Sequence, residues 1–369
     1  MVLTFWLCLA LIAYAYFGYA LWLALYVRLR PRPFPTLAAT PTVSIIIAVR
    51  NEQTNLAAKI QNLRTLNYPA ENLQVVIASD GSTDNTPDLL LQNRPFIHPI
   101  LLDHSQGKAS ALNAAVAASF GSILVFLDAR QSIDSNAVAE LASCFVDPTI
   151  GAVSGELLLA DATGNVASNA LGIYWKIEKI VRKLESASGS VVGVTGAIYA
   201  IRRELYTPMP TGTILDDLFI PMHVARTGHR VVFHPAAIAR DQLFSEKGKE
   251  FSRKVRTLTG NYQMLRIAPW LLTPANPLLF RFVSHKLLRL LVPALLILML
   301  VSSALVGSVF YQAVFLLQII FYLLAVFGAL RPSLTRFKPI AIANTFVMLN
   351  TAAALAFYNF VVGRKRVWT

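Results

Sequence analysis

Long segments without charged side chains constrain the fold of this sequence more than any other feature. Residues 1–27 carry no charge, and about 20 apolar residues are enough for a helix to cross a bilayer. Residues 290–330 form a second uncharged run, long enough for two helices if the chain turns near Gly307 and Ser308, and 339–363 is a third candidate. The sequence therefore predicts a membrane protein with an N-terminal anchor and about three C-terminal membrane helices.

A cleaved signal peptide is the alternative interpretation of residues 1–27. Such a peptide has a basic start, a shorter apolar core and a small-residue cleavage site. This segment begins uncharged and is followed by Arg28, Arg30 and Arg32, which favours an anchor. Because basic residues beside a span stay on the cytoplasmic side, the domain that follows is expected in the cytoplasm.

The basic residues of the C-terminal region do not all agree on one topology. Residues 331–338 carry three basic and no acidic side chains, which places them in the cytoplasm after a two-span hairpin. A further span over 339–363 would put Arg364, Lys365 and Arg366 outside, against the same rule. Either that segment is re-entrant or the number of spans differs by one.

The net charge of +13 indicates an anionic partner. Many of the basic residues lie beside apolar segments, so membrane lipids are the favoured partner and no nucleic acid is expected. The only cysteines, Cys8 and Cys144, have no metal-ligand spacing, which argues against disulfides and structural zinc.

Apolar runs alternate with helical patterns in the middle of the chain, after a stiff Pro-rich linker within 28–42. The predicted strands are 43–49, 74–79, 100–102 and 123–127, and the predicted helices are 54–66, 85–93 and 108–119. Runs that are apolar on both faces and alternate with helices predict an α/β fold with a parallel sheet covered on both sides.

Polar residues collect where the predicted strands end. Asn51 and Glu52 follow the first strand, Asp80 the second, Asp103 the third, and Asp128 the fourth. Any one of them has the alternative role of a helix cap or turn residue. Several carboxylates on one rim indicate a ligand site, because ligands of such sheets bind at the carboxyl ends of the strands. Neither GxGxxG nor GxxxxGK[ST] is present to indicate a dehydrogenase or a P-loop enzyme.

Seven motifs of this region occur in a specific order. They are VSIIIAVRNE at 43–52, ASDGSTD at 78–84, GKASALN at 107–113, FLDAR at 126–130, GAIYAIRR at 196–203, LDDL at 215–218 and RKVR at 253–256. In this order and spacing the sequence resembles the inverting family 2 glycosyltransferases over about 43–263. The resemblance implies a GT-A fold, with a Rossmann-like, mostly parallel sheet flanked by helices. It also implies a hexosyltransferase type of activity on a nucleotide diphosphate sugar.

The resemblance implies a donor site at the first three motifs. Glu52 and Asp80 would hold the nucleoside, with Asp80 on the base edge, where a carboxylate can accept a hydrogen bond from a base N–H. Lys108 falls where the family has a basic residue near the nucleotide, although a solvated lysine at a helix start is the alternative. A UDP-sugar is favoured over a GDP-sugar only by the habit of the family.

The fourth motif implies a divalent metal. Asp128 matches the first carboxylate of the DxD motif, which contributes to binding Mg²⁺ or Mn²⁺ at the diphosphate. The third position is Arg130, so one metal ligand is missing. Three accounts of this substitution are open. In the first, Arg130 contacts phosphate directly; in the second, Asp128 holds the metal with ligands from elsewhere; in the third, activity has been lost.

The sixth motif implies the general base. Asp216 and Asp217 resemble the (T/E)D element, whose second acid takes the proton of the acceptor hydroxyl, so Asp217 is the predicted base. Adjacent acids also stabilise the start of a helix, and 218–227 has a helical pattern. The two roles are compatible.

The last motif bears on the product. Arg253 and Arg256 fall where processive members carry (Q/R)xxRW, beside the diphosphate and the acceptor end, but Thr257 replaces the tryptophan. About four spans also supply few helices for a polysaccharide channel unless the protein assembles as an oligomer. Both features favour transfer of single sugars over polymer synthesis.

The predicted organisation is an anchor at 1–27, a linker at 28–42, a GT-A domain at 43–263, an interfacial segment at 264–286, membrane helices within 287–363 and a basic tail at 364–369. The predicted function is sugar transfer at the cytoplasmic face of the cell membrane to a lipid-linked or surface-glycan acceptor. A catalytically degenerate partner subunit that only binds nucleotide sugar is the alternative, supported by Arg130.

Overall fold

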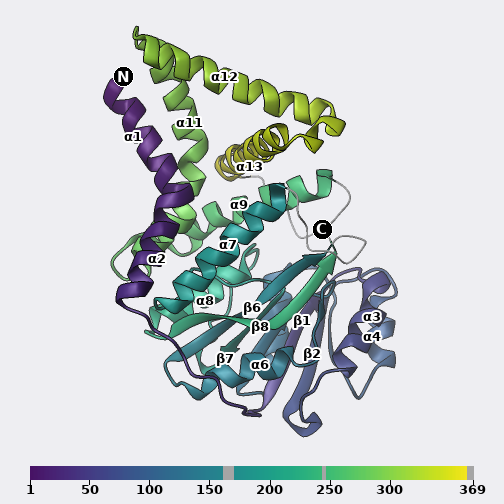
Figure 1. Ribbon diagram of the computed structural model, residues 1–369. Helices are drawn as coiled ribbons and strands as arrows, with labels where there is room; N and C mark the ends of the chain where they lie inside the picture. Colours follow the sequence, from purple (N-terminus) through teal and green to yellow (C-terminus); the bar gives the residue numbers. More distant parts are fainter. Residues whose placement is uncertain (161–169, 243–246, 364–369) are drawn as a thin grey trace.

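The computed structural model describes residues 1–160, 170–242 and 247–363. The predicted basic tail at 364–369, with Arg364, Lys365 and Arg366, lies outside the described residues. Figure 1 shows a sheet domain from which a group of long helices projects.

Four parallel strands form the first half of the sheet, in the order β3-β2-β1-β4. They are β1 (Val43–Val49), β2 (Leu73–Asp80), β3 (His98–Leu102) and β4 (Ile123–Leu127). All four coincide with predicted strands. Every residue of β1 and β4 is buried, because helices cover both faces of the sheet.

Successive side chains of β1 pack against different helical layers. Ile45 and Ile47 share a core with α3 (Gln53–Arg64), α4 (Thr86–Gln92) and α6 (Ala137–Ser143). Ile46 and Ala48 belong to a second core with α5 (Lys108–Ala117) and α8 (Asp216–Arg226). The predicted three-layer α/β architecture is therefore confirmed.

The second half of the sheet contains antiparallel strands that the sequence did not predict. β7 (Ile198–Arg202) pairs antiparallel with both β4 and β6 (Ile150–Ala160), and β6 pairs parallel with β8 (Arg230–Gln242). The short β5 (Ser132–Ile133) pairs antiparallel with β8. The order is β3-β2-β1-β4-β7-β6-β8-β5, a mostly parallel sheet of the GT-A type.

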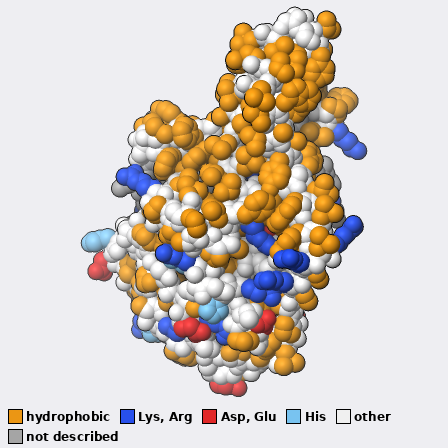
Figure 2. Space-filling model, turned by 90° about the vertical axis from the view of Figure 1, so that its left-hand side faces the viewer, with side chains coloured by type: hydrophobic (Ala, Val, Ile, Leu, Met, Phe, Trp, Pro, Cys, Tyr) orange, Lys and Arg blue, Asp and Glu red, His pale blue; other side chains and the backbone are white. Residues whose placement is uncertain are grey.

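Within the described residues, four helical segments are long and apolar enough to cross a membrane, one near the N-terminus and three in the C-terminal region. They are Val2–Leu29 (α1, Val2–Ala13; η1, Tyr14–Gly18; α2, Tyr19–Leu29), Leu279–Leu305 (α10, Leu279–Phe282; η6, Val283–Leu287; α11, Leu288–Leu305), α12 (Val309–Leu330) and α13 (Lys338–Val361). Hydrophobic side chains cover this projecting part, and Lys and Arg side chains gather on the same face of the protein below it (Figure 2). These features are those of a membrane protein.

The second of these segments begins earlier than the sequence predicted. It starts at Leu279, inside the predicted interfacial segment 264–286, and the chain turns between α11 and α12 at Gly307 as expected. Several basic side chains at its start are bound by other parts of the chain. Arg281, for example, donates hydrogen bonds to the carbonyls of Glu185, Ser188 and Ser190.

Two helices lie between the sheet domain and the apolar helices: α7 (Ala170–Ala187) and α9 (Lys247–Ile267) (Figure 1). α7 packs against α2, and α9 packs against α13.

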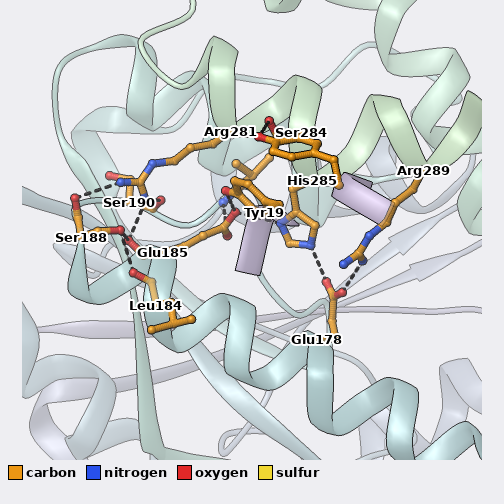
Figure 3. Close-up of polar contacts among 12 residues, drawn as sticks. Tyr19, Glu178, Leu184, Glu185, Ser188, Ser190, Arg281, Ser284, His285 and Arg289 are labelled. Atoms are coloured by element: carbon orange, nitrogen blue, oxygen red, sulfur yellow. Dashed lines mark hydrogen bonds and ion pairs between the residues drawn. The ribbon is translucent and has the colours of Figure 1, made fainter. Parts of the chain in front are cut away.

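A buried group of polar residues ties α7 to two of the apolar segments (Figure 3). We call Tyr19, Glu178, Glu185, His285 and Arg289 the interhelical cluster. The two ring nitrogens of His285 lie 2.9 Å from Glu185 Oε1 and 2.9 Å from Glu178 Oε1. Tyr19 also donates to Glu185, and Arg289 donates to Glu178, at 2.6 and 2.7 Å.

Burial alone would raise the pKa of both glutamates, but the surrounding charges and hydrogen bonds, those of His285 first among them, together outweigh it in each case. Arg289 adds to this effect at Glu178, and hydrogen bonds from Tyr19 and Val192 add to it at Glu185. The pKa of each carboxyl is therefore lowered, so both are ionised. Each ring nitrogen of His285 lies within hydrogen-bond distance of one of these carboxylates. The cluster thus joins the sheet domain to the apolar helices through paired charges.

Candidate active site

Residues from three predicted motifs meet at the carboxyl ends of the parallel strands. Asp128 follows β4, Lys108 begins α5, and Asp216 is the first residue of α8. The Lys108 ammonium lies between the two acids, 2.9 Å from Asp128 Oδ1 and 3.1 Å from Asp216 Oδ1. One cation therefore holds together carboxylates that are remote from each other in the sequence.

Lys108 is not a solvated surface lysine, because only 16% of its side chain is exposed. Burial alone would lower its pKa, but the attraction of Asp128 and Asp216 outweighs burial and raises the pKa above its ordinary value. The side chain therefore stays protonated and supplies a fixed positive charge in the site.

Asp216 has no open face toward solvent, since it is 5% exposed. Its Oδ1 pairs with Lys108, and its Oδ2 accepts a hydrogen bond of 3.1 Å from the buried hydroxyl of Tyr199. Both oxygens are occupied, so Asp216 positions its neighbours.

Asp217, the next residue, faces the cavity described below. No hydrogen bond to its carboxylate occurs within the described part of the chain. Burial and then the adjacent charge of Asp216 raise its pKa to about 6, against the opposing effect of Lys108 and Lys286. A carboxylate with a pKa of about 6 is a good proton acceptor at neutral pH.

The loop before β7 fixes the backbone of Asp217. Gly193 has a φ of 86°, a conformation that glycine adopts without strain. The following amide, of Val194, donates a hydrogen bond of 2.9 Å to the carbonyl of Asp217. At Gly196 an added Cβ would lie 3.4 Å from Asp217 Oδ2, so the small residue keeps space beside the carboxylate.

A cavity of about 310 Å³ adjoins these groups. Asp128, Lys108, Asp216 and Asp217 lie on its sheet side, together with the loop 193–197. Its other side is formed by α7, α9 and the start of the second apolar segment, and carries Arg253 and Arg256 of the last motif. The structure thus brings together six of the nine predicted site residues.

Glu52 and Asp80 do not line this cavity. Asp80 is 0% exposed, and its carboxylate accepts hydrogen bonds from Ser105 Oγ and from the amides of Gln106 and Gly107, at 2.7 to 2.9 Å. In this conformation it holds the loop that precedes Lys108. Glu52 precedes α3 and accepts a hydrogen bond of 2.7 Å from Asn55. Binding of the nucleoside by these two residues stays a prediction.

Arg130 does not line the cavity either. Its guanidinium forms an ion pair with Asp241 of β8, and Gln131 donates to the same carboxylate at 2.9 Å. Its charge is therefore compensated within the protein, which disfavours the account in which it contacts phosphate directly.

Four features of the cavity were missed by the sequence analysis. They are Glu178 and Arg182 of α7, Lys286 of η6, and residues 193–195, which directly precede the GAIYAIRR motif. Lys286 had been assigned to an interfacial segment, where a basic residue needs no further explanation. Its one distinguishing signal was its place directly before a long apolar run.

The residues present fit a divalent cation in part. Among the described residues no three His, Cys, Asp or Glu side chains come together as a metal site. Asp128 uses one oxygen for Lys108, and its side chain is 37% exposed at the cavity. It therefore offers a single carboxylate ligand, and phosphate oxygens of a donor are needed to complete the coordination.

Comparisons with known proteins bear on the family and the fold of this chain. Residues 44–209 match the family described as glycosyl transferase family 2. A poly-β-1,6-N-acetyl-D-glucosamine synthase of Staphylococcus aureus is 23% identical over 230 residues, 60% of this chain and 55% of that protein. The probable glycosyltransferase YdaM of Bacillus subtilis is 26% identical over 217 residues, 55% of this chain and 51% of that protein. The matched region thus spans about half the length of these curated relatives.

A solved structure resembles the chain over nearly its whole length. It is a mannosyltransferase of Pyrobaculum calidifontis, determined in complex with GDP-Man and Mn²⁺. The TM-score is 0.72, with 23% sequence identity, and the alignment covers 98% of this chain and 99% of the other. At this identity the likeness establishes the GT-A fold.

Proposed function

Because this chain belongs to the family 2 glycosyltransferases, we propose that it transfers a sugar, with inversion, from a nucleotide diphosphate sugar to an acceptor hydroxyl. The observation that carries the proposal is Asp217, a carboxylate with a pKa of about 6 beside the cavity. The acceptor is lipid-linked or a surface glycan, and the reaction takes place at the cytoplasmic face of the membrane. The flanking Arg28, Arg30 and Arg32 support that orientation.

The reaction is a direct displacement at the anomeric carbon. The acceptor oxygen forms a bond to the anomeric carbon while the bond from that carbon to the diphosphate oxygen breaks. The electron pair of the broken bond leaves with the nucleoside diphosphate. Asp217 takes the proton of the acceptor hydroxyl. Lys108, Arg253 and Arg256 offset charge on the leaving diphosphate.

The proposal is tested by screening nucleotide sugars with the purified full chain. Release of nucleoside diphosphate from one of them, with a sugar of inverted configuration in the product, is the expected result. Binding of a nucleotide sugar without any turnover across a broad acceptor panel would instead identify a partner subunit. UDP-sugars are tested first, and GDP-mannose is included because the structural neighbour binds it.

Polymer synthesis is a second candidate, favoured by the relative from Staphylococcus aureus. Thr257 in place of a tryptophan and the four apolar helices favour single transfers. The length of the product made with a labelled donor distinguishes the two.

The pH–rate profile is expected to have an acidic limb, in which the rate of transfer rises with pH and reaches half its maximum near pH 6. The base acts only when ionised, so kcat/KM falls as Asp217 becomes protonated below its pKa of about 6. Lys108→Met removes a charge that lowers this pKa, so the limb should move to higher pH, whatever the loss in rate. A limb that stays in place in this variant would show that another group controls the profile.

Removal of divalent cations is expected to lower the release of nucleoside diphosphate, and Mg²⁺ or Mn²⁺ to restore it. Asp128 would hold the ion together with donor phosphates, and the ion would neutralise charge on the leaving group. Asp128→Asn should raise the metal concentration needed for half-maximal rate. Equal rates in EDTA and in Mn²⁺ would contradict this role and assign charge neutralisation to the protein's own cations.

A further inference from the structure

The helical side of the cavity is cationic. It carries Arg182 on α7, Lys286 on η6, and three basic residues on α9, namely Arg253, Lys254 and Arg256. Among the described residues that line this side, Glu178 is the one acid. Its two oxygens are already bound by His285 and Arg289 (Figure 3).

Arg182 and Lys286 lack a partner in the described part of the chain, as do Asp217 and Arg256 of the same cavity. Neither Arg182 nor Lys286 makes a hydrogen bond or an ion pair within residues 1–160, 170–242 and 247–363. Each is only partly exposed, and both border the same cavity. Two like charges at a partly buried surface repel each other, and a bound anion offsets that cost.

The fold holds Lys286 in place. The preceding residue, His285, is 1% exposed and is clamped between Glu178 and Glu185, and Arg289 is bound one turn later. Arg182 lies on α7 between these two glutamates in sequence, one turn after Glu178. The interhelical cluster therefore fixes both elements that carry the unpaired cations.

The position of the pair indicates an acceptor. Lys108 and Asp128 lie on the parallel half of the sheet, where the first motifs place the donor. Arg182 and Lys286 belong to the helical elements that line the cavity, α7 and η6, and the charge of Lys286 acts on the Asp217 carboxyl. An acceptor that reaches Asp217 from the helical side passes these two cations.

Building on the proposed function, we propose that Arg182 and Lys286 bind the phosphate or diphosphate of a lipid-linked acceptor, whose sugar hydroxyl then lies at Asp217. Arg and Lys are strong donors to phosphate oxygens. Lys286 belongs to the apolar segment Leu279–Leu305, so the tail of a ligand bound there lies beside helices suited to lipid. The subsite orients the acceptor, and its phosphate is unchanged by the reaction.

The test is a binding measurement on the purified full chain in detergent, with farnesyl diphosphate as the probe. Farnesyl diphosphate should bind more tightly than farnesol, which lacks the anion, and than inorganic diphosphate, which lacks the tail. Arg182→Gln combined with Lys286→Gln should weaken binding of farnesyl diphosphate by about tenfold or more. Binding of UDP and GDP should be unchanged.

Lys176→Gln combined with Lys183→Gln is the matched control. Both residues are exposed on α7, and the control removes the same charge. Thermal unfolding of each variant checks that it is folded. The readout is independent of turnover, so it remains informative if no donor sugar is accepted.

Three results would overturn the proposal. Farnesol binding as tightly as farnesyl diphosphate would remove the need for an anion. An equal loss of UDP or GDP binding in the double variant would assign both cations to the donor. Tight binding of inorganic diphosphate alone would assign the subsite to a soluble anion.

Discussion

Asp217→Asn is expected to lower the rate of sugar transfer by about 10²- to 10⁴-fold. The amide keeps the shape of the side chain but cannot take the proton of the acceptor hydroxyl. Asp217 makes no hydrogen bond to the described residues that the substitution would break. Its cavity also keeps Lys108 and Asp128, so binding of the nucleotide should change little. The measurement is release of nucleoside diphosphate under single-turnover conditions, beside calorimetry of nucleotide binding.

Glu204→Gln is the control, since Glu204 is an exposed acid outside the cavity. It should keep the wild-type rate. Asp217→Glu retains a base of altered reach and should recover part of the activity. Unchanged turnover in Asp217→Asn would remove Asp217 from the role of base, and the proton would then have to pass to another group.

Glu185→Ala is expected to destabilise the fold by about 3–5 kcal/mol, the cost of leaving buried partners of an ion pair without their counter-charge. The carboxylate is 0% exposed and accepts hydrogen bonds from Tyr19, His285 and the amide of Val192. Its loss leaves His285 with Glu178 as its one carboxylate partner in the cluster, and loosens α7 from two apolar segments at once. The measurement is thermal unfolding of the purified protein in detergent.

Glu71→Ala, at an exposed acid in η2 (Ala70–Asn72), should leave the unfolding temperature unchanged. Glu185→Gln keeps the side-chain volume, so its unfolding temperature should lie between those of wild type and Glu185→Ala. Because the folded pKa of Glu185 lies below its ordinary value, its contribution is present above that value and is lost as pH falls. The difference in unfolding temperature between wild type and Glu185→Ala should therefore become smaller at acidic pH. A difference in unfolding temperature that does not change with pH would show that packing, and not charge, accounts for the destabilisation.

Local sequence was sufficient for most elements of the first half of the sheet domain. Strand β1 was predictable because seven consecutive residues are apolar or small, a pattern that is stable only with both faces covered. The apolar helices were predictable because uncharged runs of this length have few other stable environments. Strands β6, β7 and β8 were not predicted, since their pairing joins segments that are far apart in the chain and leaves no local signature.

The predicted site shows the same division. The pair Asp216-Asp217 was found from its motif and lies at a helix start, as its sequence indicates. Its chemistry was not predictable, because the raised pKa of Asp217 depends on burial and on its charged surroundings. The pairing of Arg130 with Asp241 joins the segment between β4 and β5 to the distant strand β8, so the substitution of Arg130 in the metal motif did not by itself reveal this ion pair.

The sequence by itself determined the family, the α/β layers, the apolar helices and the position of the acid pair. Each of these depends on residue types close together in the chain, where periodicity and motif spacing are direct signals. Only the tertiary structure decided that Lys108 bridges Asp128 and Asp216, that Asp80 faces inward, and that Arg182 and Lys286 border one cavity. The physical reason is that charge interactions act through space, and the order of the strands and the docking of α7 on the apolar helices set those distances.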